Sequence, residues 1–270
     1  MKMKGVIENV EDIKELENLE QLENLAQSEN ANIIDLWTPC EFNIDENYEY
    51  VPKEDSIFSI CSDFIYYGIA YPILKVLTKI IYDFKIEGKE NIENLEDGAI
   101  SVSNHVLFLD CAMIGLAFKD KKIYYTTQEE SFKIPFVRKL IKLLRAIPIP
   151  KSIENRKYFL KAISNLLKEK NIVHVYPEAS LWPYCQKIRN FKNGAFDMAV
   201  RNQVPVVPCV FTFREPTGIR KIFKRKKDVT LKILKPVYSE SDKYIRQQIE
   251  EVKEKVAFEI KEAIAKEEQL

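Results

Sequence analysis

His105 and Asp110 stand five residues apart, between a short apolar run and a candidate helix. Histidine is the natural base for removing a hydroxyl proton near neutral pH, and a carboxylate on its far ring nitrogen fixes the tautomer. On one continuous helix the two side chains would point about 140° apart. We therefore expect His105 in the turn and Asp110 at the helix start, with the apolar residues between them buried. A capping turn before a core helix is the structural alternative.

A second group of polar residues follows another apolar run and includes Glu178 and Ser180. A glutamate at a strand tip can position a substrate or simply cap a turn, and the residues alone leave both interpretations open. His174 alternates into the buried face of the strand, so we predict a core histidine there. Lys192, in the turn Phe191-Lys192-Asn193-Gly194, is a candidate phosphate contact.

The composition limits the kinds of functional site that the protein can have. Two histidines exclude a multi-histidine metal centre, and none of the seven glycines has the spacing of a dinucleotide or Walker loop. The five cysteines include no C-x-x-C pair, and an odd number of them is most simply explained by reduced thiols in a cytoplasmic protein.

Short apolar runs and helical stretches alternate from residue 98 onward, and these elements must position the polar residues. The candidate strands are 99–103, 122–127, 146–150, 172–176, 206–213 and 229–234. The candidate helices are 108–118, 131–144, 153–170, 191–202 and 241–266. This order predicts an α/β fold, a sheet flanked by helices, with functional residues at the strand ends.

The acidic and basic residues are unevenly distributed along the chain. Residues 1–55 hold 15 acidic and 4 basic residues although the whole chain has no net charge. We therefore predict an acidic N-terminal arm, either solvated or used for an interaction, and a basic body suited to anionic partners. The division into segments that we expect is 1–55 for the arm, 56–84 for an apolar helical segment and 85–270 for the main domain.

The apolar segment is rich in aromatic residues but carries Asp63, Lys75 and Lys79, and Pro72 interrupts it. These charges and the proline argue against a membrane span. An interfacial helix or a helical hairpin on a membrane surface fits better, and two amphipathic helices packed on the domain are the alternative.

A basic run places six cations within eight positions, 220–227. Anionic lipid headgroups are its expected partner, an acidic carrier protein is a second candidate, and a solvated loop is the structural alternative. No nucleic-acid-binding module is visible, so we expect no nucleic-acid partner.

Four motifs in order resemble those of the 1-acylglycerol-3-phosphate acyltransferase family over roughly residues 85–240. Asn104-His105…Asp110 matches the family's N-H-x-x-x-x-D motif. Ile147-Pro148-Ile149-Pro150-Lys151 resembles the second motif, with Lys151 where arginine is usual. Tyr176-Pro177-Glu178-Ala179-Ser180-Leu181 resembles the third, usually F-P-E-G-T-R, and Val204-Pro205-Val206-Val207-Pro208 resembles the fourth.

The resemblance implies direct transfer of an acyl group from acyl-CoA or acyl carrier protein to the hydroxyl of a lysophospholipid, 1-acylglycerol 3-phosphate above all. His105 would be the general base, Asp110 would orient it, and Glu178 and its loop would help to position the acceptor. No metal or bound organic cofactor would be needed. The enzyme would be cytoplasmic and peripherally associated with the membrane.

Two departures concern the acceptor. Leu181 stands where the family has an arginine that helps to hold the glycerol phosphate, and Ala179 stands where glycine is usual. Another cation would have to replace that arginine, or the acceptor differs. Arg189 is our first candidate, with Lys187 and Lys192 next, and Lys151 is expected to approach from the strand beside Glu178. The remaining substrate-binding candidates are Asn104 and Ser180. A different lysolipid or amino-lipid acceptor, and a non-catalytic lipid-binding relative, remain the alternatives.

Overall fold

The computed structural model describes residues 39–42, 44–52, 56–217, 221–222, 226–240 and 242–268. Most of the predicted acidic arm, and Arg220, Lys224 and Arg225 of the basic run, lie outside the described residues.

A seven-stranded mixed sheet forms the centre of the molecule, in the order β1-β7-β6-β2-β5-β3-β4. Strands β2, β3, β4, β5 and β6 run parallel to one another, and β7 is antiparallel to β6 and parallel to β1. The bounds are β1 Lys85–Glu87, β2 Ala99–Ser103, β3 Ile123–Gln128, β4 Ala146–Ile149, β5 Ile172–Val175, β6 Val206–Arg214 and β7 Asp228–Ile233. The carboxyl ends of β2 and β5, which carry the two polar groups of the sequence, are therefore neighbours at one sheet edge.

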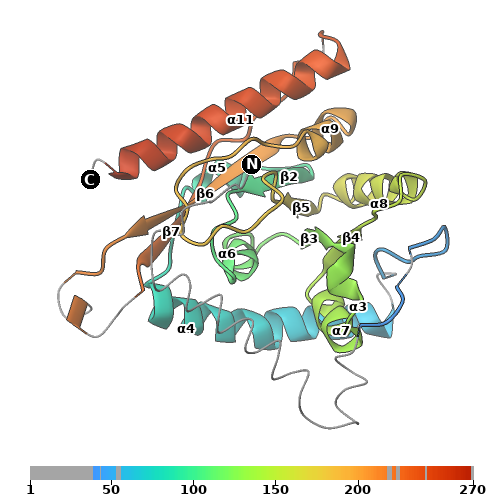
Figure 1. The fold of residues 1–270 in the computed structure, drawn as a ribbon, viewed down its shortest axis with the longest axis horizontal. Coiled ribbons are helices and arrows are strands. Elements are labelled where there is room, and N and C mark those ends of the chain that lie inside the picture. Colours follow the sequence, from blue (N-terminus) through green and yellow to red (C-terminus); the bar gives the residue numbers. More distant parts are fainter. Residues whose placement is uncertain are drawn as a thin grey trace, which may run out of the picture.

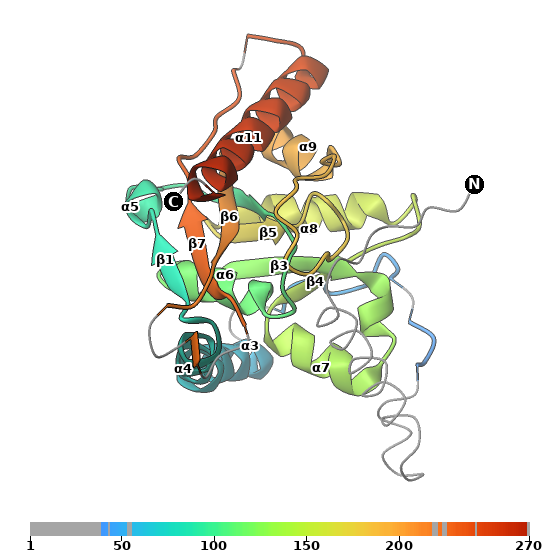
Figure 2. The same ribbon diagram turned by 60° about the vertical axis from the view of Figure 1, so that its left-hand side comes forward.

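Helices cover both faces of the sheet, which gives the three layers seen in Figures 1 and 2. One face carries α8 (Arg156–Lys168), α9 (Gly194–Arg201) and α11 (Ile245–Glu268), and the other carries α6 (Asp110–Ala117). Beyond α6 lies a long helical segment made of α3 (Ile57–Asp63), η1 (Phe64–Ala70) and α4 (Tyr71–Tyr82), with α7 (Pro135–Leu143) beside α3. Two further elements, α5 (Glu90–Glu93) and η2 (Glu129–Phe132), are short.

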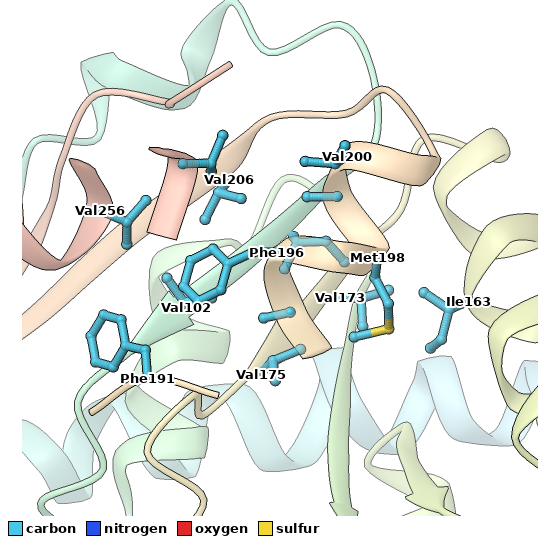
Figure 3. Packing of buried hydrophobic residues seen from close by; sticks show 14 of the residues in the cluster. Val102, Ile163, Val173, Val175, Phe191, Phe196, Met198, Val200, Val206 and Val256 are labelled. Carbon is cyan, nitrogen blue, oxygen red and sulfur yellow. The ribbon is translucent and has the colours of Figure 1, made fainter. Parts of the chain in front are cut away.

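The core has two parts, one on each face of the sheet. Figure 3 shows the part beneath α8, α9 and α11, where Val102 and Val173 of the central strands meet Phe196 and Ile163. The other part packs α6 and α4 against the opposite face. Because side chains alternate along a strand, Ser101, Ser103 and His174 point to this second face, where the polar site is built.

All six predicted strands are present within one residue of their expected bounds, and the α/β fold is confirmed. Strand β1 was not predicted. It has only three residues, two of them charged, so it carries no apolar alternation, and its place comes from parallel pairing with β7.

The expectation that Pro72 interrupts the apolar segment is wrong, and there is no hairpin. The segment is one helix from Ile57 to Tyr82, 26 residues long, and by length and composition it could cross a membrane. Residues 64–70 form a π-helical stretch, and the amide of Tyr71 bonds to the carbonyl of Tyr66, five residues back. Pro72 follows at the start of α4, so its missing N–H and its ring are accommodated by this local widening.

Candidate active site

The connection from β2 to α6 carries the predicted pair and is held at both ends. The amide group of Asn104 donates to the carbonyl of Phe211 at 3.1 Å and accepts from the Phe211 N–H at 2.8 Å. Asn104 is buried and so ties the end of β2 to β6. Farther along, the amides of Trp182 and Tyr184 donate to the carbonyls of His105 and Val106 at 2.9 and 3.0 Å. These bonds fix the backbone on which His105 stands.

His105 and Asp110 meet as predicted, with His105 in the turn and Asp110 as the first residue of α6. The His105 Nδ1 atom lies 2.7 Å from Asp110 Oδ2. The same oxygen accepts the backbone N–H groups of Val106 and Leu107 at 3.1 and 3.3 Å. Asp110 is fully buried, whereas the His105 side chain is 23% exposed. The carboxylate is thus fixed inside the protein, and the imidazole reaches the surface.

This arrangement determines which ring nitrogen of His105 carries the proton. A carboxylate is an acceptor, so Nδ1 carries the hydrogen and Nε2 is left as the basic nitrogen. Within the described part of the chain, no group forms a hydrogen bond with Nε2. A partly exposed imidazole with a free basic nitrogen and a buried carboxylate behind it can take a proton from a bound hydroxyl.

The expectation that the residues between the pair are buried is correct only in part. Val106 and Leu107 are buried, but Phe108 is 71% exposed. The predicted helix 108–118 begins later, at Asp110, because Phe108 and Leu109 form the turn that lets Asp110 face back toward His105.

Tyr176, for which the sequence alone predicts no role, contacts both members of the pair. Its ring stacks on the imidazole of His105, with centroids 3.9 Å apart and planes inclined by 18°. Its hydroxyl donates to Asp110 Oδ1 at 2.8 Å and also lies 3.2 Å from Cys111 Sγ. Burial, and next the charge of Asp110, hold the pKa of Tyr176 well above its ordinary value, so the phenol stays protonated. The one signal in the sequence is a tyrosine where the resembled motif usually has phenylalanine.

His174 is the core histidine that the strand pattern predicts. It is fully buried, and its two ring nitrogens face Ser101 Oγ at 3.1 Å and Ser103 Oγ at 3.4 Å. Burial, followed by the charge of His105, lowers the pKa of His174 to about 3. His174 is therefore neutral near pH 7, and it supports the ring of Tyr176 edge-on at 4.6 Å.

Glu178 lies buried at the tip of β5, and Arg189 reaches it from the following loop. The guanidinium donates from Nε at 2.8 Å and from Nη2 at 2.6 Å to one oxygen, Glu178 Oε2. Nη2 also donates to the carbonyl of Ser180, and the guanidinium lies over the ring of Trp182. The other oxygen, Glu178 Oε1, is buried with no hydrogen-bond partner among the described residues. Arg189 is thus brought to the strand tip as expected, already paired with a carboxylate.

The turn after Glu178 is strained at one position. Ala179 has φ = +56°, in the left-handed region that favours glycine. This geometry explains why glycine is usual there in the resembled motif, and Ala179 costs about 1 kcal/mol relative to it.

The other residues predicted to bind the substrate lie at different distances from Glu178. Lys187 and Lys192 are exposed, with no ion pair among the described residues, and lie on either side of Arg189 in the segment between β5 and α9. Ser180 is also exposed, at the strand tip. The prediction that Lys151 approaches from the strand beside Glu178 is wrong: β4 pairs with β3 alone, so two strand spacings, about 10 Å, separate it from β5. Lys151 is instead exposed and paired with Glu130.

No cluster of three or more histidine, cysteine, aspartate or glutamate side chains that could hold a metal ion occurs within the described ranges. The acidic and imidazole groups of the site instead pair with one another or with Arg189.

Residues 83–212 match the model of the family described as Acyltransferase. The chain is 30% identical over 162 residues to "1-acyl-sn-glycerol-3-phosphate acyltransferase LPAT1, chloroplastic" of Arabidopsis thaliana, which is 58% of this chain and 44% of that protein. It is 27% identical over 178 residues to a 1-acyl-sn-glycerol-3-phosphate acyltransferase of Saccharomyces cerevisiae, with 63% and 56% covered. The chain therefore spans about half the length of these relatives.

Among solved structures, the crystal structure of a 1-acyl-sn-glycerophosphate acyltransferase from Thermotoga maritima is similar, with a TM-score of 0.48 and 21% identity. The similarity covers 76% of this chain and 95% of that one.

Proposed function

We propose that this chain, whose residues 83–212 match the acyltransferase family, transfers a fatty acyl group from a thioester to the hydroxyl of a lysophospholipid. The observation that carries the proposal is the pair of His105 and Asp110, joined at 2.7 Å with the imidazole at the surface and Nε2 free. The donor would be acyl-CoA or acyl carrier protein, and 1-acylglycerol 3-phosphate is the first acceptor, which would give phosphatidic acid.

In the proposed reaction, Nε2 of His105 takes the acceptor hydroxyl proton as the oxygen attacks the thioester carbonyl. The new C–O bond forms, the tetrahedral intermediate collapses, and the C–S bond breaks. The imidazolium then returns its proton to the leaving thiolate, so thiol and ester are the products. Asp110 stays ionised and stabilises the imidazolium, which is the role that its buried position favours.

The Glu178–Arg189 pair is the proposed contact for the acceptor. Glu178 Oε1 is a buried acceptor without a partner among the described residues, so it suits a second hydroxyl of the glycerol unit. Arg189 retains donors beyond those given to Glu178, and Lys187 and Lys192 lie exposed nearby in the chain. Together these groups would hold the phosphate in place of the absent arginine at Leu181. Ser180 completes the proposed set, and Lys151, nearer β3, would contact only a more distant part of a substrate. The prediction that Asn104 binds substrate is wrong, because Asn104 is buried and its amide group bonds to the backbone of Phe211 on both sides.

A second candidate acceptor rests on the same pair. Arg189 gives two donors to Glu178, so its charge is partly neutralised before any substrate binds. A lysolipid with a headgroup other than a bare phosphate would fit a site in which the positive charge of Arg189 is partly neutralised by Glu178. The family is the same in both cases, and only the acceptor differs.

We also propose that the protein is cytoplasmic and lies on a membrane surface through the helix Ile57–Tyr82. Its outer side exposes Ile60, Phe64, Ile73, Val76 and Ile80. Only 11% of the most apolar stretch of the helix is buried in the protein. The inner side is bonded to the domain. Asp63 pairs with Arg145 at 2.7 Å, Ser62 Oγ donates to the Leu143 carbonyl at 2.7 Å, and the hydroxyls of Tyr66 and Tyr125 lie 3.0 Å apart. A helix bound lengthwise to a polar domain is suited to lie in the interface rather than to cross it.

The basic run, residues 220–227, also favours binding of this side of the protein to a membrane surface. Lys226 Nζ lies over the ring of Tyr82, the last residue of α4, at 5.6 Å. The connection between β6 and β7 thus brings Lys226 to one end of the apolar helix, where anionic headgroups would meet it.

The proposal is tested by mass analysis of lipids after the purified chain is incubated with acyl-CoA or acyl carrier protein and a mixture of lysolipids. Acylated 1-acylglycerol 3-phosphate as the main product supports the first acceptor, and acylation of another lysolipid alone supports the second. Folded protein that acylates no lysolipid with either donor would leave a non-catalytic lipid-binding relative and overturn the proposal.

A further inference from the structure

We infer that Tyr176 is a positioning residue that sets the proton affinity of His105 through Asp110, an inference that rests on the proposed function. The observation behind it is that one side chain contacts both partners, the imidazole with its ring and the carboxylate with its hydroxyl.

The two oxygens of Asp110 have separate partners. Oδ2 accepts from His105 and from the amides of Val106 and Leu107, whereas Oδ1 accepts the Tyr176 hydroxyl at 2.8 Å. Asp110 is fully buried, so no water replaces that hydroxyl without a change of structure. A hydrogen bond to a buried carboxylate withdraws charge from it, and this lowers the stabilisation that the carboxylate gives to an imidazolium.

The ring of Tyr176 has a second effect. Stacked at 3.9 Å on the imidazole face, it limits rotation of His105 about its side-chain bonds and leaves the Nε2 edge uncovered. His174 contacts the same ring edge-on, and the amide of Trp182 holds the His105 carbonyl. Ring and hydroxyl together fix where the basic nitrogen points and how strongly it binds a proton.

Three neighbouring titratable groups, Cys111, His174 and Tyr125, do not change charge near neutral pH. Burial raises the pKa of the Cys111 thiol to about 12 and lowers that of His174 to about 3. Burial also raises the pKa of Tyr125, which lies on β3 on the same side of the sheet, well above its ordinary value. Glu178 and Arg189, at the tip of β5, are paired with each other. A change in the titration of His105 on loss of the Tyr176 hydroxyl would therefore report the bond to Asp110.

The test is Tyr176→Phe, which keeps the stacked ring and removes one oxygen. The protein has two histidines, and His174 does not titrate above about pH 4, so ring-labelled histidine gives one titrating NMR signal, that of His105. In Tyr176→Phe its midpoint should move to higher pH by about 0.5 to 1 unit, and the acid limb of the kcat/KM profile should move with it. We expect kcat at pH 7 to fall by no more than about tenfold, the limit that a rise of one unit sets on the unprotonated fraction of His105.

Tyr125→Phe is the matched control, because it removes another buried phenol oxygen, one bonded to Tyr66 and not to Asp110. Its His105 midpoint should equal that of the wild type. Incorporation of 3-fluorotyrosine, a stronger donor, should move the wild-type midpoint the opposite way and leave that of Tyr176→Phe unchanged. An unshifted midpoint in folded Tyr176→Phe, or an equal shift in Tyr125→Phe, would overturn the inference. Absence of acyl transfer by the wild type would instead overturn the proposed function, and the NMR titration would still decide the role of Tyr176.

Discussion

Arg189 donates two hydrogen bonds to a single oxygen of Glu178, at 2.8 and 2.6 Å, and leaves the second oxygen buried without a partner in the described structure. This ion pair bears on how the acceptor's headgroup is held. A guanidinium held at the strand tip stands in the region where the resembled family places an arginine that this chain lacks, since Leu181 occupies that position.

Arg189→Ala should therefore raise KM for a phosphate-bearing acceptor by about tenfold or more, because loss of one charged hydrogen bond costs about 1.5 to 3 kcal/mol. The KM for the thioester donor should stay within about twofold. Lys187→Ala tests the second candidate cation, which is exposed and forms no ion pair within the described ranges. Unchanged acceptor kinetics in both variants would show that neither cation holds the headgroup and would favour a different acceptor.

The membrane face gives a second prediction. Replacing Ile73, Val76 and Ile80 with serine should reduce flotation with vesicles, because three exposed apolar side chains of the long helix are lost. Changing Lys221, Lys226 and Lys227 to glutamine should weaken binding to anionic vesicles by up to about 3 kcal/mol and leave neutral vesicles unaffected. Phe258→Ser is the control, since Phe258 is exposed on α11, across the sheet from the long helix. Equal binding by all three variants would refute the proposed face.

Much of this architecture follows from local patterns, and the remainder depends on contacts that no local pattern encodes. The strands around Val102 and Val173 are predictable because buried parallel strands are short continuous apolar runs. The pairing of His105 with Asp110 follows from their spacing at a strand-to-helix turn. Strand order is not written in the sequence, which is why Lys151 was expected beside Glu178 although β3 lies between their strands. The helix through Pro72 depends on a π-helical stretch, and the contact of Tyr176 with Asp110 joins residues 66 positions apart.

Gly115 gives a third prediction, about how the long helix is attached. A Cβ at this position of α6 would overlap the hydroxyl oxygens of Tyr66 and Tyr125, which are buried and bonded to each other. Gly115→Ala should lower the free energy of unfolding by about 1 to 3 kcal/mol through overpacking. In the control, Gly68→Ala, the new Cβ meets only the Phe64 ring at 3.6 Å, so stability should be unchanged or rise by up to about 1 kcal/mol. Urea unfolding of the two variants measures this, and equal stabilities would contradict the packing described.

His174 predicts a pH dependence of stability. Its pKa falls from 6.5 to about 3 in the folded protein, so the unfolded chain binds a proton that the folded protein does not. Its stabilising contribution is complete above about pH 6.5 and is lost as the pH falls, by at most about 1.4 kcal/mol per unit.

His174→Gln should remove this part of the pH dependence, because glutamine is uncharged at every pH and can still bond to Ser101 and Ser103. The measurement is the free energy of unfolding in urea at pH 7 and pH 5.5. The wild type should lose about 1 kcal/mol more than the variant over this interval. Equal losses in the two proteins would contradict a neutral buried His174.

The central claim is that His105, oriented by Asp110, removes the acceptor proton, and one measurement tests it most directly. Acyl transfer from the thioester donor to the acceptor that the wild type uses best is followed by product mass in the wild type, His105→Ala and Asp110→Asn. Urea unfolding of each variant reports its fold. We expect His105→Ala to lower kcat by about 10²- to 10⁴-fold with the fold intact, and Asp110→Asn to impair it as well through loss of tautomer control. A folded His105→Ala variant with near wild-type turnover would contradict the account.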